Sequence, residues 1–404
     1  MQRLEVVVIL LSDKITYIIG SNSISVRPLV PYHDRVCQFL AHLSSGLRDN
    51  IQSKVYPDVL AFAFAFRQAN ILKLKRAFDN RCPRIGLGKI FHITPSNVPV
   101  NFAFSFVFGV LSGNANVVRL PSKSFAQVDI ICSTIKQLFS ENQYREIRDM
   151  TAFVQYKQND EITAEFSSSC NVRIVWGGDD TIRNIRKIPI PEKSTEITFP
   201  DRHSLCIINS LSVIELDDIG LNRLAEGFYR DTYLMDQNAC SSPHLVVWLG
   251  TDNEIAKGKF WEAVCRVAID KYDFGPMKAV DKYARLCQDA IGLNNISVDR
   301  KYKNLLYCVQ LKNLSEHMHD LRGKYGYFYE YDADDISFLK GIVNSKYQTL
   351  TYFGVNKSEL INFVIENGLL GIDRIVPIGH ALDIGVIWDG YDLVTSLSRI
   401  IDVR

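Results

Sequence analysis

Hydrophobic and polar positions change their spacing along the chain. Short apolar runs separated by polar turns predict a small meander of edge strands at 4–11, 16–20 and 23–28. Helical spacing then predicts two helices, over residues 33–49 and 56–79. From Ile85 onwards, short apolar strands alternate with amphipathic helices, which predicts an α/β fold with helices on the faces of a parallel sheet.

The alternating part of the sequence, from Ile85 onwards, predicts nine strands, eight helices and one domain boundary. The predicted strands lie at 88–94, 116–120, 150–155, 172–176, 205–209, 245–249, 305–311, 325–330 and 347–353. The predicted helices lie at 101–112, 123–139, 161–168, 179–187, 217–233, 252–272, 279–291 and 357–366. The cluster of Pro189, Pro191 and Pro200 predicts a domain boundary near 200–206. Ligands of such sheets bind beyond the carboxyl ends of the strands, where the candidate residues are sought.

Composition narrows the class of protein. The chain has 404 residues, 47% hydrophobic and 23% charged, and a net charge of +1, which favours a soluble globular protein that binds neither nucleic acid nor an anionic membrane. Its nine cysteines are scattered without any CxxC pair, so we expect a reducing cytoplasm, no disulfide framework and no metal site. We expect neither a signal peptide nor a membrane span, because the longest apolar run, 102–111, is too short.

One candidate site follows the first strand of the alternating part. Here Thr94 leads into the turn Pro95-Ser96-Asn97-Val98-Pro99, and an apolar helix follows. At the end of a strand, the Asn97 amide is suited to donate a hydrogen bond to a developing oxyanion. From the spacing alone, a second interpretation is favoured, in which Asn97 only caps the helix.

Phosphate binding is suggested at two further strand ends. Arg119, Ser122 and Lys123 supply two cations and a hydroxyl after one strand, although such residues also occur on ordinary solvated surfaces. Gly177 and Gly178 lie between a strand and a helix, where glycines permit close approach of a phosphate. The two aspartates that follow these glycines would repel a phosphate, so the second signal is weak.

A single cysteine stands out in the stretch 236–244. Cys240 lies among small and polar residues between two long apolar segments, and backbone N–H groups near such a thiol lower its pKa. His244, four residues later, is a candidate base for it. Most cysteines are inert and buried, so this pattern alone leaves the nucleophile undecided.

Taken together, these residues resemble the aldehyde dehydrogenase superfamily. The turn at 95–99 stands where that family has P-W-N-F-P, residues 113–123 where it has G-N-x-V-V-L-K-P-S-E, and residues 173–178 where it has a glycine-bearing turn. The chain is more closely similar to the LuxC-type fatty-acyl reductases of bacterial bioluminescence systems. That similarity rests on the segments Cys240-Ser241-Ser242-Pro243, 347–354, 373–379 and 388–390.

The resemblance implies a fold, a set of domains and roles for the candidate residues. It implies a Rossmann-type cofactor domain over residues 1–205, a catalytic domain over 206–380, and a C-terminal segment, 381–404, that packs back on the core. It implies Cys240 as nucleophile, Asn97 as oxyanion donor and His244 as a further catalytic residue. The cofactor-binding residues would be Thr94, Pro95, Arg119, Ser122, Lys123, Gly177 and Gly178.

Three departures from the superfamily pattern refine the expected chemistry. The stretch 199–204 stands where hydrolytic members keep a general-base glutamate, and it has none, which suits transfer of an acyl group rather than hydrolysis. The lysine of K-P-S-E is Leu120 here, and the side chain of Arg119 should point to the opposite face of the strand. The acidic end of K-P-S-E is Lys123, which would attract a 2′-phosphate, so we expect NADPH rather than NADH.

The expected activity is NADPH-dependent reduction of a long-chain acyl-CoA, or acyl-protein thioester, to the aldehyde through an acyl-Cys240 intermediate. The resemblance also implies an acyl-protein synthetase or acyltransferase partner, and we expect a homo-oligomer. Two alternatives stay open from the sequence. One is another enzyme of the same fold, acting on a short-chain acyl-CoA, an acyl phosphate or a free aldehyde, and the other is a non-catalytic relative.

Overall fold

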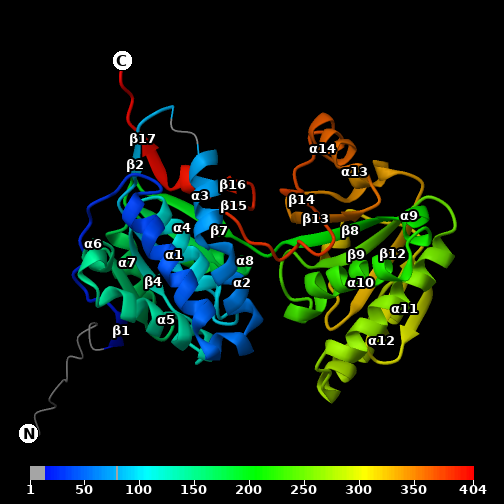
Figure 1. Ribbon diagram of the computed structural model, residues 1–404. Helices are drawn as coiled ribbons and strands as arrows, with labels where there is room; N and C mark the ends of the chain where they lie inside the picture. Colours follow the sequence, from blue (N-terminus) through cyan, green and yellow to red (C-terminus); the bar gives the residue numbers. More distant parts are fainter. Residues whose placement is uncertain (1–13, 79–80) are drawn as a thin grey trace, which may run out of the picture. The chain divides into compact units, whose positions relative to one another are not determined.

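The protein folds into two compact units, each built around one large sheet (Figure 1). The structure is a computed structural model that describes residues 14–78 and 81–404, apart from the side chains of residues 298 and 299. Unit 1 comprises Met1–Pro200 together with Ile384–Arg404, and unit 2 comprises Asp201–Asp383. The strand expected at 4–11 lies outside the described residues.

Unit 1 contains a six-stranded sheet in the order β1-β5-β4-β3-β6-β7, parallel except for β1 against β5. Its strands are β1 (Thr16–Ile19), β3 (Lys89–Ile93), β4 (Ala115–Arg119), β5 (Thr151–Gln155), β6 (Val172–Trp176) and β7 (Thr195–Phe199). From β3 the chain builds β4 and β5 on one side and then β6 and β7 on the other. This order makes a topological switch point between β3 and β6, the usual place for a bound ligand.

Helices cover both faces of this sheet. One core contains residues of α1 (Asp34–Asp49), α2 (Pro57–Ala65), α3 (Gln68–Ala77), α4 (Asn101–Leu111), α5 (Ala126–Phe139) and α6 (Arg145–Asp149). The core on the other face contains residues of α7 (Asp160–Ser168) and α8 (Asp179–Ile185). Residues of β3, β4, β5 and β6 enter both cores, which is why these strands are largely apolar.

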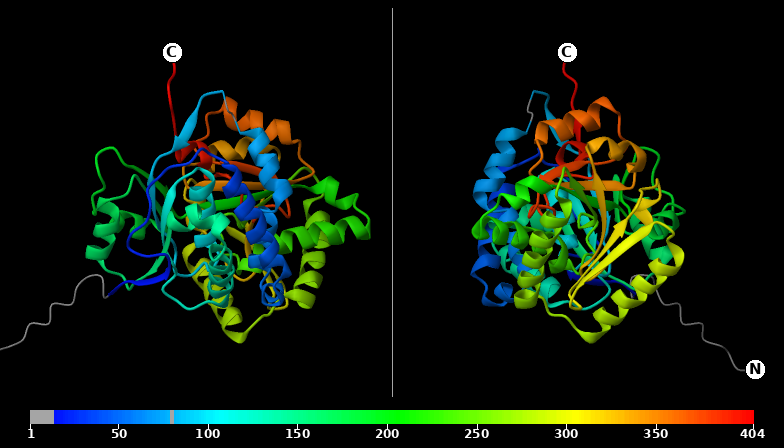
Figure 2. Two further views of the ribbon diagram at one scale, coloured as in Figure 1. Left: turned by 60° about the vertical axis from the view of Figure 1, so that its left-hand side comes forward. Right: turned by 90° about the vertical axis from the view of Figure 1, so that its right-hand side faces the viewer.

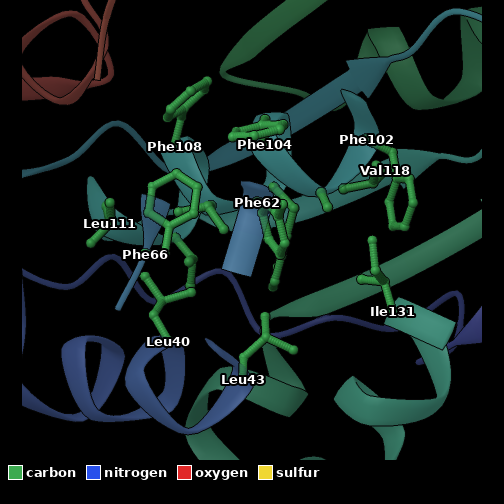
Figure 3. Close-up of a cluster of buried hydrophobic side chains, with 14 of the residues drawn as sticks. Leu40, Leu43, Phe62, Phe66, Phe102, Phe104, Phe108, Leu111, Val118 and Ile131 are labelled. Atoms are coloured by element: carbon green, nitrogen blue, oxygen red, sulfur yellow. The ribbon is translucent and has the colours of Figure 1, made fainter. Parts of the chain in front are cut away.

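Aromatic side chains fill much of the first core. Figure 3 shows Leu40 and Leu43 reaching from α1 towards the phenylalanines of α2 and α4. The rings of Phe62 and Phe104 meet edge to face with their centroids 5.0 Å apart. Each buried phenylalanine contributes roughly 1.5–3 kcal/mol through its removal from water, so this cluster anchors the helical layer to the sheet.

The last residues of the chain return to unit 1. They form β15 (Ile387–Trp388), β16 (Tyr391–Asp392), α15 (Leu393–Ser396) and β17 (Ser398–Ile400). β17 pairs antiparallel with β2 (Arg84–Gly86), and the carbonyl of Leu397 accepts a hydrogen bond from the amide of Asn114 at 2.9 Å. Buried Trp388 and Leu393 belong to the first core, so this segment completes that unit.

Unit 2 contains a seven-stranded sheet in the order β10-β11-β12-β9-β8-β13-β14. Its strands are β8 (His203–Asn209), β9 (Pro243–Leu249), β10 (Ile296–Tyr302), β11 (Leu306–Leu311), β12 (Tyr327–Ala333), β13 (Tyr347–Phe353) and β14 (Arg374–Pro377). Only the pair β10–β11, yellow in Figure 2, is antiparallel.

Helices cover both faces of the second sheet as well. One core contains residues of α9 (Ser210–Ile214), α10 (Asp218–Thr232) and α11 (Asn253–Lys271). The other contains residues of α12 (Pro276–Gly292), α13 (Leu339–Ile342) and α14 (Lys357–Glu366). The carboxyl end of α10 leads directly into the stretch that holds Cys240.

The predicted α/β class is confirmed, while several elements differ from expectation. Residues 23–28 form no strand; they are an extended segment whose Ser25 N–H donates to the Asp149 carbonyl at 2.7 Å. The expected meander is therefore absent from the described residues, and β1 pairs with distant β5. The helix predicted over 56–79 is split at Arg67, whose backbone is extended (φ −62°, ψ 151°). Strands β7 and β10 were not expected, because neither has a long apolar run.

Candidate active site

Cys240 lies in a tight loop between a 3₁₀ turn, η4 (Tyr233–Met235), and β9. Asp236 and Gln237 open this loop with φ angles of 51° and 62°, a left-handed backbone that non-glycine residues seldom adopt. The cysteine itself is partly exposed, whereas Ser241 and Ser242 after it are buried. The loop thus presents one thiol from a rigid, strained turn, an arrangement that is common at functional sites.

The buried amide of Gln237 holds the loop in this conformation. Its Nε2 donates to the carbonyls of Pro243 at 3.1 Å and Tyr327 at 2.9 Å. Its Oε1 accepts from the backbone N–H groups of Gly326 and Tyr327, both at 3.2 Å. One side chain therefore satisfies four backbone groups and ties the loop to the start of β12.

Replacing Gln237 with leucine should destabilise the protein severely. The change leaves four buried backbone groups without partners, and each such group costs about 1–3 kcal/mol. We expect the free energy of unfolding, measured in urea, to fall by about 3 kcal/mol or more. Asn238→Ala is the matched control, because that neighbouring amide is exposed and donates only to the Met235 carbonyl. Equal stabilities of the two variants would contradict the assigned role.

Two buried serines fix the backbone around Cys240. The Ser204 hydroxyl donates to the carbonyl of Cys240 at 2.7 Å and accepts from the backbone N–H of Thr349 at 3.1 Å. The Ser242 hydroxyl donates to the carbonyl of Asp231 at 2.6 Å. Sequence reasoning missed both serines. The one available signal was that Ser204 ends the stretch 199–204, where the superfamily keeps its glutamate.

The surroundings of His244 disfavour a role as base. It is buried in β9, and its ring stacks on that of His203 with centroids 5.3 Å apart. Burial, together with nearby cations of which Arg322 is the strongest, lowers the pKa of His244 to about 3. An imidazole of this kind is a weak proton acceptor near neutral pH, which disfavours the base role.

The residues after β3 lie at the switch point of unit 1. Thr94 is buried, and its hydroxyl donates to the carbonyl of Arg119 at 2.6 Å, which joins the carboxyl ends of β3 and β4. Pro95 and exposed Asn97 follow in the loop. Val100, not Asn97, is the N-cap residue of α4, and no side chain caps that helix. The alternative of a capping role for Asn97 is therefore wrong, and its amide faces solvent.

The residues after β4 supply positive charge at the same edge. The Arg119 guanidinium lies over the ring of Tyr156, 4.3 Å from its centroid, on the face that also carries Val117. Ser122 and Lys123 are exposed in the loop before α5, which begins only at Ala126. Among the described residues, Lys123 forms no ion pair. A hydroxyl and an unneutralised ammonium suit a phosphate group.

The residues after β6 complete this edge of the sheet. Gly177 continues the pairing with β7, donating from its N–H to the Phe199 carbonyl at 3.2 Å, and Gly178 is the N-cap residue of α8. A Cβ on Gly177 would lie 3.0 Å from the side chain of Thr181, so a larger residue would crowd this turn. Asp180 in the first turn of α8 is exposed and pairs with Arg183 at 2.9 Å. The positive groups that could hold a phosphate at this edge therefore follow β4, whereas α8 begins with carboxylates.

A series of hydrogen bonds between buried side chains links β6, α4, β3 and β4 near the switch point. Trp176 Nε1 donates to the Ser105 hydroxyl at 2.9 Å, and that hydroxyl lies 2.7 Å from His92 Nδ1. His92 Nε2 in turn lies 3.0 Å from Asn116 Oδ1, which assigns its proton to Nε2. Burial lowers the pKa of His92 to about 4, so the ring stays neutral. Each of these ring nitrogens and the Ser105 hydroxyl therefore has a hydrogen-bond partner.

The predicted residues thus form two groups. Thr94, Pro95, Asn97, Arg119, Ser122, Lys123, Gly177 and Gly178 belong to unit 1, and Cys240 and His244 belong to unit 2. Across 14–78 and 81–404, no three His, Cys, Asp or Glu residues are grouped so as to hold a metal ion. Over the same residues, no helix is both long and apolar enough to cross a bilayer.

The sequence profile of the family described as acyl-CoA reductase (LuxC) matches residues 32–322. The long-chain acyl-protein thioester reductase 2 of Photobacterium leiognathi is 24% identical over 169 residues, which cover 42% of this chain and 33% of that protein. The match therefore spans about a third of the length of that relative.

Solved structures show the fold. Aldehyde dehydrogenase 21 of Physcomitrella patens, in complex with succinate, superposes with a TM-score of 0.64 at 10% identity, covering 92% of this chain and 86% of that one. The glyceraldehyde-3-phosphate dehydrogenase GapN of Methanocaldococcus jannaschii, complexed with NADP, gives 0.62 at 15% identity, covering 91% and 88%. The expected aldehyde dehydrogenase-like fold is confirmed.

Proposed function

The chain belongs to the acyl-CoA reductase (LuxC) family, and we propose that it reduces a long-chain fatty acyl thioester to the aldehyde. The family defines an oxidoreductase that acts on acyl groups. The observation that carries the finer proposal is the rigid loop that presents Cys240, whose backbone is held by Ser204, Gln237 and Ser242. Such preorganisation is what a covalent nucleophile needs.

In the proposed reaction, the thiolate of Cys240 attacks the carbonyl carbon of the acyl thioester. A new carbon–sulfur bond forms, the donor leaves as its thiolate, which then takes up a proton, and the acyl group remains on Cys240. The Asn97 amide and the backbone N–H of Cys240 donate to the oxyanion as charge develops. NADPH, when bound, would supply the hydride that reduces the acyl group on Cys240. Collapse of the resulting hemithioacetal releases the aldehyde and restores the Cys240 thiolate.

The lack of a general-base glutamate in 199–204 supports attack on the acyl-enzyme by hydride rather than by water. No glutamate occurs in 199–204, and Ser204 of that stretch is occupied with the Cys240 carbonyl and the Thr349 N–H. His244, which we had expected to assist, has a pKa lowered to about 3 by burial. We therefore propose that His244 supports the loop as a neutral ring and does not take the cysteine proton.

The donor is proposed to be acyl-CoA or an acyl-protein thioester. The second form is supported by the relative in Photobacterium leiognathi, which is described as an acyl-protein thioester reductase. Delivery by an acyl-protein synthetase, a homo-oligomeric state and a cytoplasmic location are further parts of the proposal. Incubation with NADPH and acyl-CoAs of 4 to 16 carbons tests the activity directly. Aldehyde formed only from the longer chains would support it, and no aldehyde from any thioester would refute it.

Coenzyme preference provides a separate prediction. Exposed Lys123 should bind the 2′-phosphate, so kcat/KM should be higher with NADPH than with NADH. A charge-assisted hydrogen bond contributes about 1.5–3 kcal/mol. Lys123→Glu should therefore lower kcat/KM for NADPH by about tenfold to a hundredfold and leave kcat/KM for NADH unchanged. Lys54→Glu, at an exposed lysine elsewhere in unit 1, is the control. A wild-type enzyme that uses NADH as well as NADPH would rule the assignment out.

A further inference from the structure

Asp231 connects the Cys240 loop to a second segment of unit 2. It lies in the last turn of α10, with its side chain almost completely buried. Its carboxylate accepts hydrogen bonds from the backbone N–H groups of Gly379 at 2.6 Å and Ala381 at 2.9 Å. Its backbone carbonyl accepts from the Ser242 hydroxyl at 2.6 Å. One residue therefore holds both segment 377–381 and the residue two positions after Cys240.

Segment 377–381 is shaped to reach this carboxylate. Gly379 has a φ of +95°, and a Cβ there would lie 3.0 Å from both the Arg230 guanidinium and the Cα of Gly227. Only glycine permits this approach of the segment to α10. From the other side, the Arg374 guanidinium donates to the carbonyl of Ala381 at 2.9 Å. The segment is thus bound through its N–H groups to Asp231 and through a carbonyl to Arg374.

Opposing effects act on the pKa of the Asp231 carboxyl. Burial raises the pKa of its carboxyl to about 7, although the two backbone N–H groups and the Arg230 cation act in the opposite direction. Asp383, two residues after the segment, adds to the rise of this pKa, and His380 in the segment pairs with Asp383 at 2.7 Å. Cys206 on β8 is the remaining titratable group that interacts with Asp231, and burial keeps it a neutral thiol.

Folding and hydrogen bonding favour opposite forms of this carboxyl. Because the folded-state pKa lies above the usual 3.8, the protonated acid favours the folded state, and that stabilisation is lost as pH rises through about 7. The ionised form, in contrast, accepts both backbone N–H groups, whereas a protonated oxygen is a poorer acceptor. A buried charge that weakens the fold near neutral pH while completing a loop contact is typical of a functional position.

We propose, on the basis of the acyl-Cys240 reaction above, that Asp231 is a positioning residue. Its ionised carboxylate holds segment 377–381, and its carbonyl holds Ser242, so that the acyl group on Cys240 keeps the orientation that hydride transfer needs. Protonation releases one of the two N–H groups and loosens the segment. The hydride step should therefore slow on acidification for a reason independent of the ionisation of the thiol, which is no longer free in the acyl-enzyme.

Single-turnover reduction of pre-acylated enzyme separates this effect from acylation. The wild-type enzyme is loaded with the longest acyl-CoA that it accepts between octanoyl and hexadecanoyl, freed of excess thioester and mixed with NADPH from pH 6 to pH 8. We expect the wild-type rate to rise through about pH 7. Asp231→Asn should be at least about tenfold slower at pH 8 and insensitive to pH, because misplacement of reacting groups by a fraction of an ångström has effects of this size.

Ser242→Ala is the matched control, because it removes the other hydrogen bond and leaves the carboxyl in place. Its rate should fall but keep the wild-type pH dependence. A wild-type rate and pH profile for Asp231→Asn would overturn the inference. If that variant does not fold, hydrogen exchange in the wild-type chain decides: the Gly379 and Ala381 amides should be less protected at pH 6 than at pH 8, after correction for intrinsic exchange. Equal protection would overturn the inference.

These readouts keep the two proposals distinct. Intact mass before the NADPH pulse shows whether the wild-type enzyme is acylated at all. If no acyl-enzyme forms from any thioester, the proposed function fails, while hydrogen exchange still tests the hold of Asp231 on segment 377–381. If the acyl-enzyme forms and Asp231→Asn reduces it as the wild type does, only the positioning role fails.

Discussion

Replacing Cys240 with alanine should abolish both formation of the acyl-enzyme and reduction of acyl thioesters. Loss of a covalent nucleophile lowers turnover by roughly four to six orders of magnitude, because the remaining machinery can only bind and polarise the substrate. Serine at this position should be nearly as inactive, since its hydroxyl lacks the low pKa of a thiol. Rates of NADPH oxidation and of aldehyde release, followed with the same acyl-CoA, measure the effect.

The control for this substitution is a second accessible thiol. Cys287 is exposed on α12 of the same unit, and Cys287→Ala should keep wild-type activity and acylation. We also expect Cys240→Ala to fold normally, because the side chains of Gln237, Ser204 and Ser242 hold the loop. A Cys240→Ala enzyme that still reduces acyl-CoA would show that reduction needs no covalent capture on this residue.

Asn97→Ala should lower kcat by about a hundredfold or more and change KM little. Loss of one oxyanion donor costs about 2.7–4 kcal/mol in the transition state, and the ground-state carbonyl gains much less from the same hydrogen bond. The same variant should keep the melting temperature of the wild type. Asn97 is exposed and caps no helix, since the N-cap residue of α4 is Val100.

This combination separates catalysis from structure. A capping role would have reduced stability by about 1 kcal/mol and left kcat unchanged. Ser96→Ala is the control, because Ser96 is the exposed neighbour in the same loop. An Asn97→Ala enzyme with wild-type kcat would remove Asn97 from the proposed oxyanion site and leave only the backbone N–H of Cys240.

Local pattern was sufficient to predict most of the architecture. Strands such as β4 and β9 are largely apolar and buried because both of their faces are covered, and the helices between them show helical spacing. The switch point is seen only in the structure, where β6 adds on the far side of β3 from β4. β7 and β10 escaped prediction because Thr195–Phe199 has only two apolar residues and Ile296–Tyr302 is largely polar.

The site was less predictable, because its supports come from distant parts of the sequence. Cys240 and the strand-end residues carry local signals, but Gln237 is bonded to Tyr327 and Ser204 to Thr349. Such pairs share no spacing rule, and only the sheet order of unit 2 brings them together. His244 shows the opposite case. Its closeness in sequence suggested a base, whereas its place inside β9 buries it and makes it a poor one.

Intact mass spectrometry of the wild-type enzyme mixed with acyl-CoAs, without reductant, tests the proposed chemistry most directly. The predicted result is one added acyl group per chain, located on Cys240 by peptide mapping, absent from Cys240→Ala and discharged as aldehyde when NADPH is added. An unmodified mass in a preparation that nevertheless reduces acyl-CoA, or an acyl group on another residue that NADPH discharges, would contradict the proposal.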